Sequence, residues 1–157
     1  DLVRSRGLGD VYKRQVLDGY VKKAGTNFVL SVGRLIGSQP ELKGEQRLRK
    51  EDIYWEMPRC YQWDITVNLP EGYRISPEGL ERLNVKVEND CGAFIVQATT
   101  EDGTLRIKAE KRINHKTEPV ANWEKLLEIT DAANSYEALS IVFQATINPP
   151  TSPTTGY

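Results

Sequence analysis

The chain has 157 residues, of which 21 are basic and 22 acidic, and 39% of its residues are hydrophobic. Charges of both signs are interspersed and sum to a net charge of −1, so we expect no nucleic-acid partner. No run of about 18 apolar residues occurs, so we also expect no membrane span.

The first stretch of note is SRGLGDVYKRQ, residues 5–15, which has neither the alternation of a strand nor the spacing of a helix. One permitted codon spelling of these residues resembles a sequencing adapter translated in frame. We therefore expect residues 1–15 to be foreign to the domain, as in a metagenomic fragment, and Val16 to be an interior residue of a longer gene. The alternative is an ordinary basic N-terminal arm.

The next part of the chain predicts short strands around an irregular segment. Residues 27–35 and 51–57 carry β-branched or aromatic residues bounded by Gly, Pro, Asn or Asp, which is typical of strands. Residues 37–50 between them are polar and contain Gly37, Pro40 and Gly44. We expect these residues to form a long connection or an irregular edge.

The clearest strand lies at residues 61–69, where apolar and polar side chains alternate. Pro70 and Gly72 then predict a turn. Residues 76–83 can form one short helical turn, and residues 83–89 predict another strand.

Two further strands are predicted to form an antiparallel hairpin. Residues 92–101 are followed by Asp102 and Gly103, which favour a tight turn, and then by a second alternating segment, residues 105–113. Its apolar side chains are those of Leu105, Ile107, Ala109 and Ile113, opposite Arg106, Lys108, Glu110 and Arg112.

The one long helix is predicted at residues 117–138, with Thr117 as its cap and Pro119 in its first turn. An apolar stripe follows its length, formed by Val120, Trp123, Leu126, Leu127, Thr130 and Ala133. Because such a stripe must cover apolar surface, we expect the helix to lie on a sheet face. Residues 139–147 predict a last strand, and residues 149–157 a disordered tail rich in Pro and Thr.

These elements predict one mainly β domain over residues 16–148, α+β by content, as an antiparallel β-sandwich-like fold with one long helix near the C-terminus. From Tyr20 to Phe143, and above all in VGRLIG and LPEGY, the chain resembles the C-terminal β-rich domain of unknown function of bacterial transglutaminase-like proteins. In that group the domain follows a papain-like core. The resemblance implies export to the periplasm or cell surface and implies no activity for this domain.

A thiol protease-like or transglutaminase-like site requires a cysteine, a histidine and an orienting side chain. The chain offers Cys91 and His115, but Cys91 lies in a predicted turn and not at a helix N-terminus, which lowers a thiol pKa. We expect His115 to face solvent at a strand end. We therefore expect no catalytic residue and no enzyme activity.

Cys60 and Cys91 permit one disulfide, which the sequence neither requires nor excludes. With His115 they are too few for a structural zinc site, and no nucleotide-, zinc- or calcium-binding motif occurs. We therefore expect no metal-ligating or cofactor-binding residue and no cofactor.

The aromatic residues are interpreted mainly as core. Trp63 and Trp123 are in phase with apolar neighbours, and Trp55 shares one side of its strand with Ile53 and Met57. Tyr54 is expected to point outward, and a sugar-binding platform is the less favoured alternative.

Together these observations predict a non-catalytic accessory domain that contacts the upstream domains of an exported transglutaminase-like protein. A weak self-association through the N-terminal half, at residues 27–36 and the outer side of residues 51–57, is a further expectation. The alternative is a stand-alone module that binds peptide or glycan.

Overall fold

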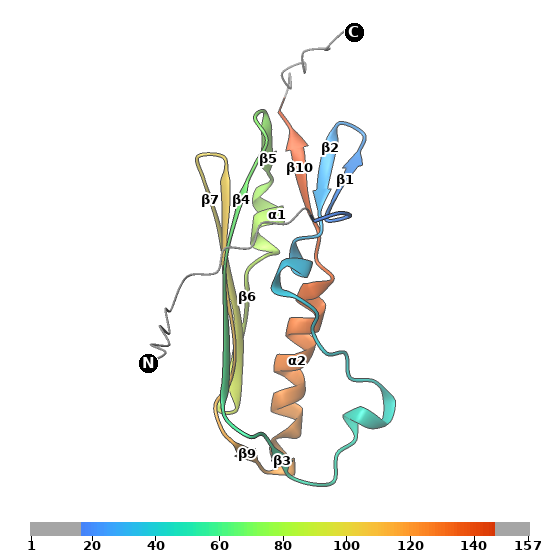
Figure 1. Ribbon diagram of the computed structural model, residues 1–157, viewed down its shortest axis with the longest axis vertical. Helices are drawn as coiled ribbons and strands as arrows, with labels where there is room; N and C mark the ends of the chain where they lie inside the picture. Colours follow the sequence, from blue (N-terminus) through green and yellow to red (C-terminus); the bar gives the residue numbers. More distant parts are fainter. Residues whose placement is uncertain (1–16, 147–157) are drawn as a thin grey trace, which may run out of the picture.

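The computed structural model describes residues 17–146, and Figure 1 shows a long sheet on one side of the molecule with a helix beside it. The strands are β1 (Val21–Ala24), β2 (Asn27–Leu30), β3 (Ile53–Tyr54), β4 (Arg59–Asn68), β5 (Tyr73–Ile75), β6 (Val85–Asn89), β7 (Gly92–Glu101), β8 (Thr104–Ile113), β9 (Thr117–Glu118) and β10 (Ile141–Ala145). The helices are α1 (Pro77–Glu81) and α2 (Trp123–Glu137), with 3₁₀ turns η1 (Val32–Ile36), η2 (Gly44–Arg47) and η3 (Val120–Asn122).

The large sheet is antiparallel, with strand order β4-β8-β7-β6. Strands β7 and β8 meet in a two-residue turn in which Asp102 and Gly103 have φ angles of 45° and 70°. Positive φ at both positions is what a tight hairpin between right-twisted strands requires. The predicted hairpin is therefore confirmed.

The predicted alternation of buried and exposed side chains is confirmed along β8, whereas Tyr61, expected on the buried face of β4, is 48% exposed. Along β8, Leu105, Ile107 and Ala109 are buried, while Arg106 and Lys108 on the opposite face are exposed. The buried face forms the core together with Phe94 and Val96 of β7, side chains from α2 and several residues of the second sheet.

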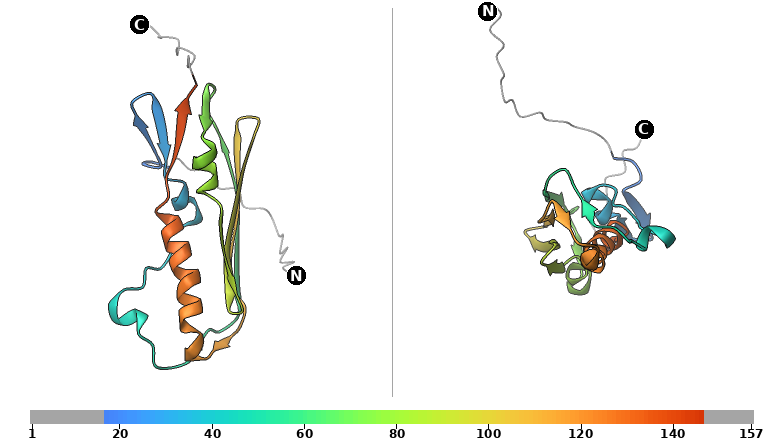
Figure 2. Two further views of the ribbon diagram at one scale, coloured as in Figure 1. Left: turned by 180° about the vertical axis from the view of Figure 1, so that it is seen from behind. Right: turned by 90° about the horizontal axis from the view of Figure 1, so that it is seen from below.

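The helix α2 packs against β6 and β7, and Figure 2 shows it running along the sheet. Its buried residues include Ile129 and Ala133, and the ring of Tyr136 meets Phe94 of β7 edge to face, with ring centroids 5.8 Å apart. The Tyr136 hydroxyl is buried without a hydrogen-bond partner among the described residues, and burial raises its pKa to about 12. Tyr136 therefore packs as an apolar side chain between α2 and β7.

A second sheet, with strand order β1-β2-β10-β5, lies beyond the C-terminal end of α2 (Figure 1). Its link to the helix is η1, where the Gly33 backbone N–H donates to the carbonyl of Leu139. The approach is so close that a Cβ on Gly33 would lie 1.9 Å from the carbonyl oxygen of Tyr136. Only glycine fits this contact.

The predicted helix start was wrong. Thr117 and Glu118 form β9, which pairs with Tyr54 and Ile53 of β3, and α2 begins at Trp123. Pro119 precedes the 3₁₀ turn η3, so Thr117 caps no helix. Pairing with a distant segment thus overrides the local helix signal.

Several predicted strands are shorter than expected. Residues 27–35 form a strand only as far as Leu30, because η1 follows, and residues 51–57 pair only over β3. Strands β1 and β5 were not predicted. The irregular segment 37–50 and the short helix α1 are confirmed, as is the mainly antiparallel β class with one long helix near the C-terminus. The foreign segment 1–15 and the tail 149–157 lie outside the described residues.

Gly33→Ala is expected to destabilise the domain by about 1–3 kcal/mol, because the added methyl must displace backbone atoms at the end of α2. The free energy of unfolding in urea measures this effect. The control is Gly25→Asn, because Gly25 has a positive φ of 64° that asparagine tolerates and a Cβ there meets no atom within 4 Å. Equal stability of the two variants would contradict the close contact at Gly33.

Candidate functional site

Two places in the described residues bring chemically active side chains together. The first lies where β9 meets the start of α2, and it contains the two residues that the sequence singled out, Cys91 and His115. Between them lies Glu118, a carboxylate only 2% exposed. Nδ1 of His115 lies 2.5 Å from Oε1 of Glu118, and Nδ2 of Asn122 donates to Oε2 at 2.8 Å.

The Cys91 thiol faces the same carboxylate. Burial raises the pKa of this thiol, and the negative charge of Glu118 raises it further. Burial also disfavours the charged form of Glu118, but contacts with His115 and Asn122 outweigh that effect and lower the pKa of its carboxyl group. The cluster therefore holds a carboxylate and a neutral thiol.

This order of groups does not suit acyl transfer. A thiol nucleophile needs the imidazole beside it, with the carboxylate or amide on the far side of the ring. Here the carboxylate occupies the central position, and the thiol is fully buried. The arrangement fits a structural link between β9, the start of α2 and the β6–β7 turn.

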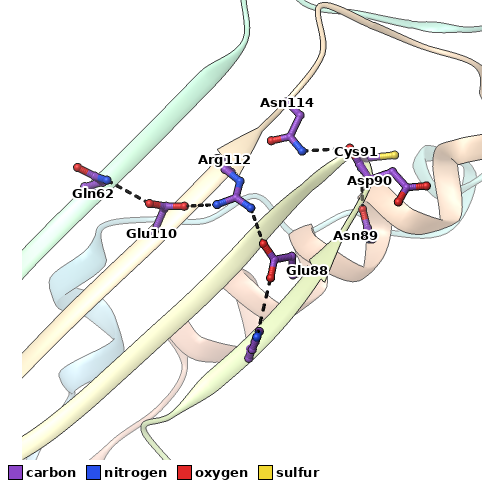
Figure 3. A network of polar contacts seen from close by, with 9 residues as sticks. Gln62, Glu88, Asn89, Asp90, Cys91, Glu110, Arg112 and Asn114 are labelled. Carbon is purple, nitrogen blue, oxygen red and sulfur yellow. Dashed lines mark hydrogen bonds and ion pairs between the residues drawn. The ribbon is translucent and has the colours of Figure 1, made fainter.

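The β6–β7 turn is held by its own polar contacts (Figure 3). Asn89 accepts from the backbone N–H of Cys91 and donates to the carbonyl of Lys125 in α2. Asn114 bonds to the backbone of both Asp90 and Cys91. These contacts fix Cys91 in the predicted turn, pointing inward.

Figure 3 also shows a polar network on the outer face of the large sheet. Arg112 of β8 pairs with Glu110 of its own strand and reaches Glu88 of β6, crossing above Ala93 of β7. Gln62 of β4 extends the network at 3.1 Å from Glu110. Arg112 is shared between the two carboxylates, so the network links β4, β8 and β6 and stabilises the strand order.

The second place is a cavity of about 490 Å³ on the inner face of β4 and β8. It exists because α2 lies on the other half of the sheet, over β6 and β7. A helix is about 10 Å across, whereas about 14 Å separates the outer strands of a four-stranded sheet, so one helix leaves part of the face open. A covering segment, residues 36–57, which contains the irregular residues 37–50 and β3, closes that part.

The cavity has an aromatic wall and a polar rim. Trp55, Tyr61 and Trp63 supply the aromatic rings, and those of Tyr61 and Trp63 are nearly parallel, with centroids 6.1 Å apart. The remaining lining residues come from the covering segment, β4, β8 and α2: Ile36, Ser38, Gln39, Pro40, Arg59, Lys111, Ile113 and Thr130.

Two cations stand on this inner face. Nζ of Lys111 donates to the side-chain oxygen of Gln39 at 3.0 Å, and among the described residues neither Lys111 nor Arg59 has a carboxylate oxygen within 4.0 Å. Burial lowers the pKa of Lys111. The cavity thus combines an apolar wall with unpaired positive charge.

This cavity was not predicted from the sequence, although one residue pointed to it. Lys111 alternates in β8 with the same spacing as Leu105, Ile107 and Ala109, so the alternation places its charged side chain on the buried face of the sheet. Trp63 was interpreted as core and is half-buried at the cavity wall. Tyr54 points outward as expected, 63% exposed.

Met57 does not share the buried side of Ile53 and Trp55, as had been expected. It is 62% exposed, because β3 ends at Tyr54 and the alternation stops there. Trp123 packs in a small apolar cluster with Ile53 and Cys91, consistent with its predicted core role.

Over residues 17–146, no group of three or more His, Cys, Asp or Glu side chains could hold a metal ion. Within the same residues, no helix is long and apolar enough to cross a membrane.

Comparison with known families gives a match over residues 32–143, to the family described as "Domain of Unknown Function with solved-structure structure (DUF3858)". The chain belongs to this family. The DUF3858 match covers the whole of the large sheet, the residues that line the cavity and all of α2. The comparison with curated proteins and that with solved structures found no match.

The buried Glu118 predicts a pH dependence of stability. Because its pKa is lowered in the folded state, its carboxylate stabilises the fold at pH above about 4, and this contribution is lost as the pH falls through the lowered pKa. Glu118→Gln is expected to lose about 1–3 kcal/mol at pH 7, and the difference from the unmodified chain should shrink on acidification. Urea unfolding at several pH values measures both effects, with exposed Glu128→Gln as the control.

The two cysteines give a second prediction. Both are free thiols in the structure, with Cys60 exposed and Cys91 buried, so the alternative of a bridge between them is not realised. A thiol reagent should label one cysteine rapidly in the folded chain and two after denaturation. Cys60→Ser should abolish the rapid phase, and an absence of labelling in the denatured, unreduced chain would contradict free thiols.

Proposed function

We propose that this domain is a non-catalytic interaction module, and that it serves as an accessory domain of an exported transglutaminase-like protein. The observation that carries the binding role is the cavity at Trp55, Tyr61 and Trp63, with Lys111 and Arg59 unpaired at its edge. Proteins place such groups where a ligand is held, because apolar walls supply affinity and a few polar groups fix orientation.

The absence of catalysis is supported by the geometry around Cys91. Its thiol is fully buried, its pKa is raised and the Glu118 carboxylate faces it where an imidazole is needed. A chain that uses these residues for stability has no activated nucleophile at this place.

The accessory role is supported by the resemblance of residues 20–143 to the C-terminal domains of bacterial transglutaminase-like proteins. On this proposal the partners are upstream domains of the same protein, with weak self-association of the isolated domain, and the location is the periplasm or cell surface. The second candidate is a stand-alone module for peptide or glycan, favoured by the aromatic wall of the cavity. The intact gene separates the two, because the first requires an upstream Cys, His and Asp core.

The purified chain is expected to show no transamidase, amidase or protease turnover above background on acyl-transfer substrates. The double variant Cys91→Ala with His115→Ala should be indistinguishable from the unmodified chain in these assays. Turnover that disappears in Cys91→Ala and persists in Cys60→Ala would overturn the non-catalytic role.

The accessory role is tested separately, with the upstream core expressed from the intact gene. Titration of the core with this chain in a calorimeter should give binding with a Kd in the micromolar range, as for contacts between domains of one chain. No heat and no co-elution at about 0.1 mM would contradict the accessory role and leave the stand-alone module.

A further inference from the structure

We propose that the cavity binds the carboxyl-terminal end of an extended peptide, with the terminal carboxylate at Lys111 and Arg59 and an apolar last side chain against the aromatic wall. This inference rests on the proposed binding function and names the chemical class of its ligand.

The charge of the ligand follows from the placement of the two cations. Lys111 lies opposite Tyr61, and Arg59 opposite Ile113, so the two cations are diagonal neighbours on adjacent strands. Diagonal neighbours stand about 7–8 Å apart, a span that two long side chains can close around one carboxylate. Like charges at this separation repel each other, and an anion between them removes the repulsion.

The apolar part of the ligand follows from the wall. Trp55, Tyr61 and Trp63 present ring faces, while Ile36 and Ile113 add aliphatic surface. A volume of about 490 Å³ lies within the range of about 300–1,000 Å³ typical of small-ligand sites. The site therefore suits a carboxylate joined to an apolar group.

The free edge of β4 favours a peptide over an acidic sugar. β4 is the outermost strand of its sheet and pairs only with β8 among the described residues. In a two-residue turn the flanking residues, here Glu101 and Thr104, exchange backbone hydrogen bonds. Successive residues of a strand direct their backbone groups to opposite sides, so those of Leu105 and of every second residue after it point toward β4.

Val67 of β4 lies opposite Leu105 of β8, so the odd-numbered residues of β4 form backbone hydrogen bonds with β8. The backbone groups of Cys60, Gln62 and Asp64 consequently point away from the sheet, beside the cavity. An extended peptide can pair with these groups while its end enters the cavity, as in β-strand addition. A sugar lacks the regularly spaced backbone N–H and C=O groups that pair with this row of donors and acceptors.

The test uses acetyl-Ala-Ala-Leu with a free carboxylate, the same peptide as its amide, and glucuronic acid. Binding is followed by tryptophan fluorescence, since Trp55 and Trp63 line the cavity. We expect a Kd below about 1 mM for the acid peptide and at least about tenfold weaker binding of the amide and of glucuronic acid.

Lys111→Met should weaken the binding of the acid peptide about tenfold and leave the affinity for the amide unchanged. The matched control is Lys108→Met, on the exposed face of the same strand. Arg59→Gln is a second variant at an exposed position, which keeps the test valid if Lys111→Met fails to fold. Bound peptide should also slow hydrogen exchange at the amides of Gln62 and Asp64.

Equal affinity for acid and amide, or an unchanged affinity in both Lys111→Met and Arg59→Gln, would overturn the carboxylate site. Binding of glucuronic acid without the peptide would overturn the peptide assignment and keep a binding module. No binding of the acid peptide at about 10 mM would overturn the inference. The proposed function is distinguished from it, because its own tests are the acyl-transfer assay and the titration with the upstream core.

Discussion

The structure depends on a difference in width, because the single helix α2 is narrower than the four-stranded sheet on which it packs. α2 packs mainly on β6 and β7, so the inner face of β4 and β8 must be kept from water by another part of the chain. The chain uses the covering segment, residues 36–57, which is mainly polar over residues 37–50 and is fastened by polar contacts. Arg47 forms a bidentate pair with Asp131 of α2, both contacts at 2.8 Å, and Nε1 of Trp123 donates to the carbonyl of Arg47. A cover fastened by a few separate polar contacts packs less tightly than a second helix, and the cavity is the space that remains.

The buried Glu118 belongs to the same arrangement. The covering segment ends in β3, and β3 pairs with β9, which contains Glu118. One carboxylate thus joins the end of the cover to His115, Asn122 and the β6–β7 turn. Burying a carboxylate costs free energy unless its partners compensate, so the residues that resemble a catalytic set serve to keep this charge satisfied. A cysteine and a histidine that lie close together are therefore no sign of catalysis until the group between them is known.

What could be predicted from the sequence depended on how far apart the interacting residues are. The alternation in β4 and β8 and the Asp102-Gly103 turn are local signals, and they predicted these strands and the β7–β8 hairpin, but not the pairing of β4 with β8. Thr117 failed as a helix cap because β9 pairs with Tyr54, more than sixty residues away in the chain, and no local pattern encodes that pairing. The cavity has the same origin, since its walls come from β4, β8, α2 and the covering segment. The one local signal for the cavity was Lys111, a charged residue at a position of β8 where the alternation predicts an apolar one.

Gln39 shows how the cover and the cavity work as one unit. Its backbone N–H donates to Glu137 near the end of α2, while its side chain accepts from Lys111 across the cavity. The first contact holds the cover to the helix, and the second gives a partly buried ammonium group a neutral partner. A carboxylate accepts the same kind of hydrogen bond as the neutral Gln39 amide and adds the attraction between opposite charges, so a carboxylate can displace that amide from Lys111. The backbone contact with Glu137 is independent of that exchange, so the cover can stay on the helix when the cavity is filled.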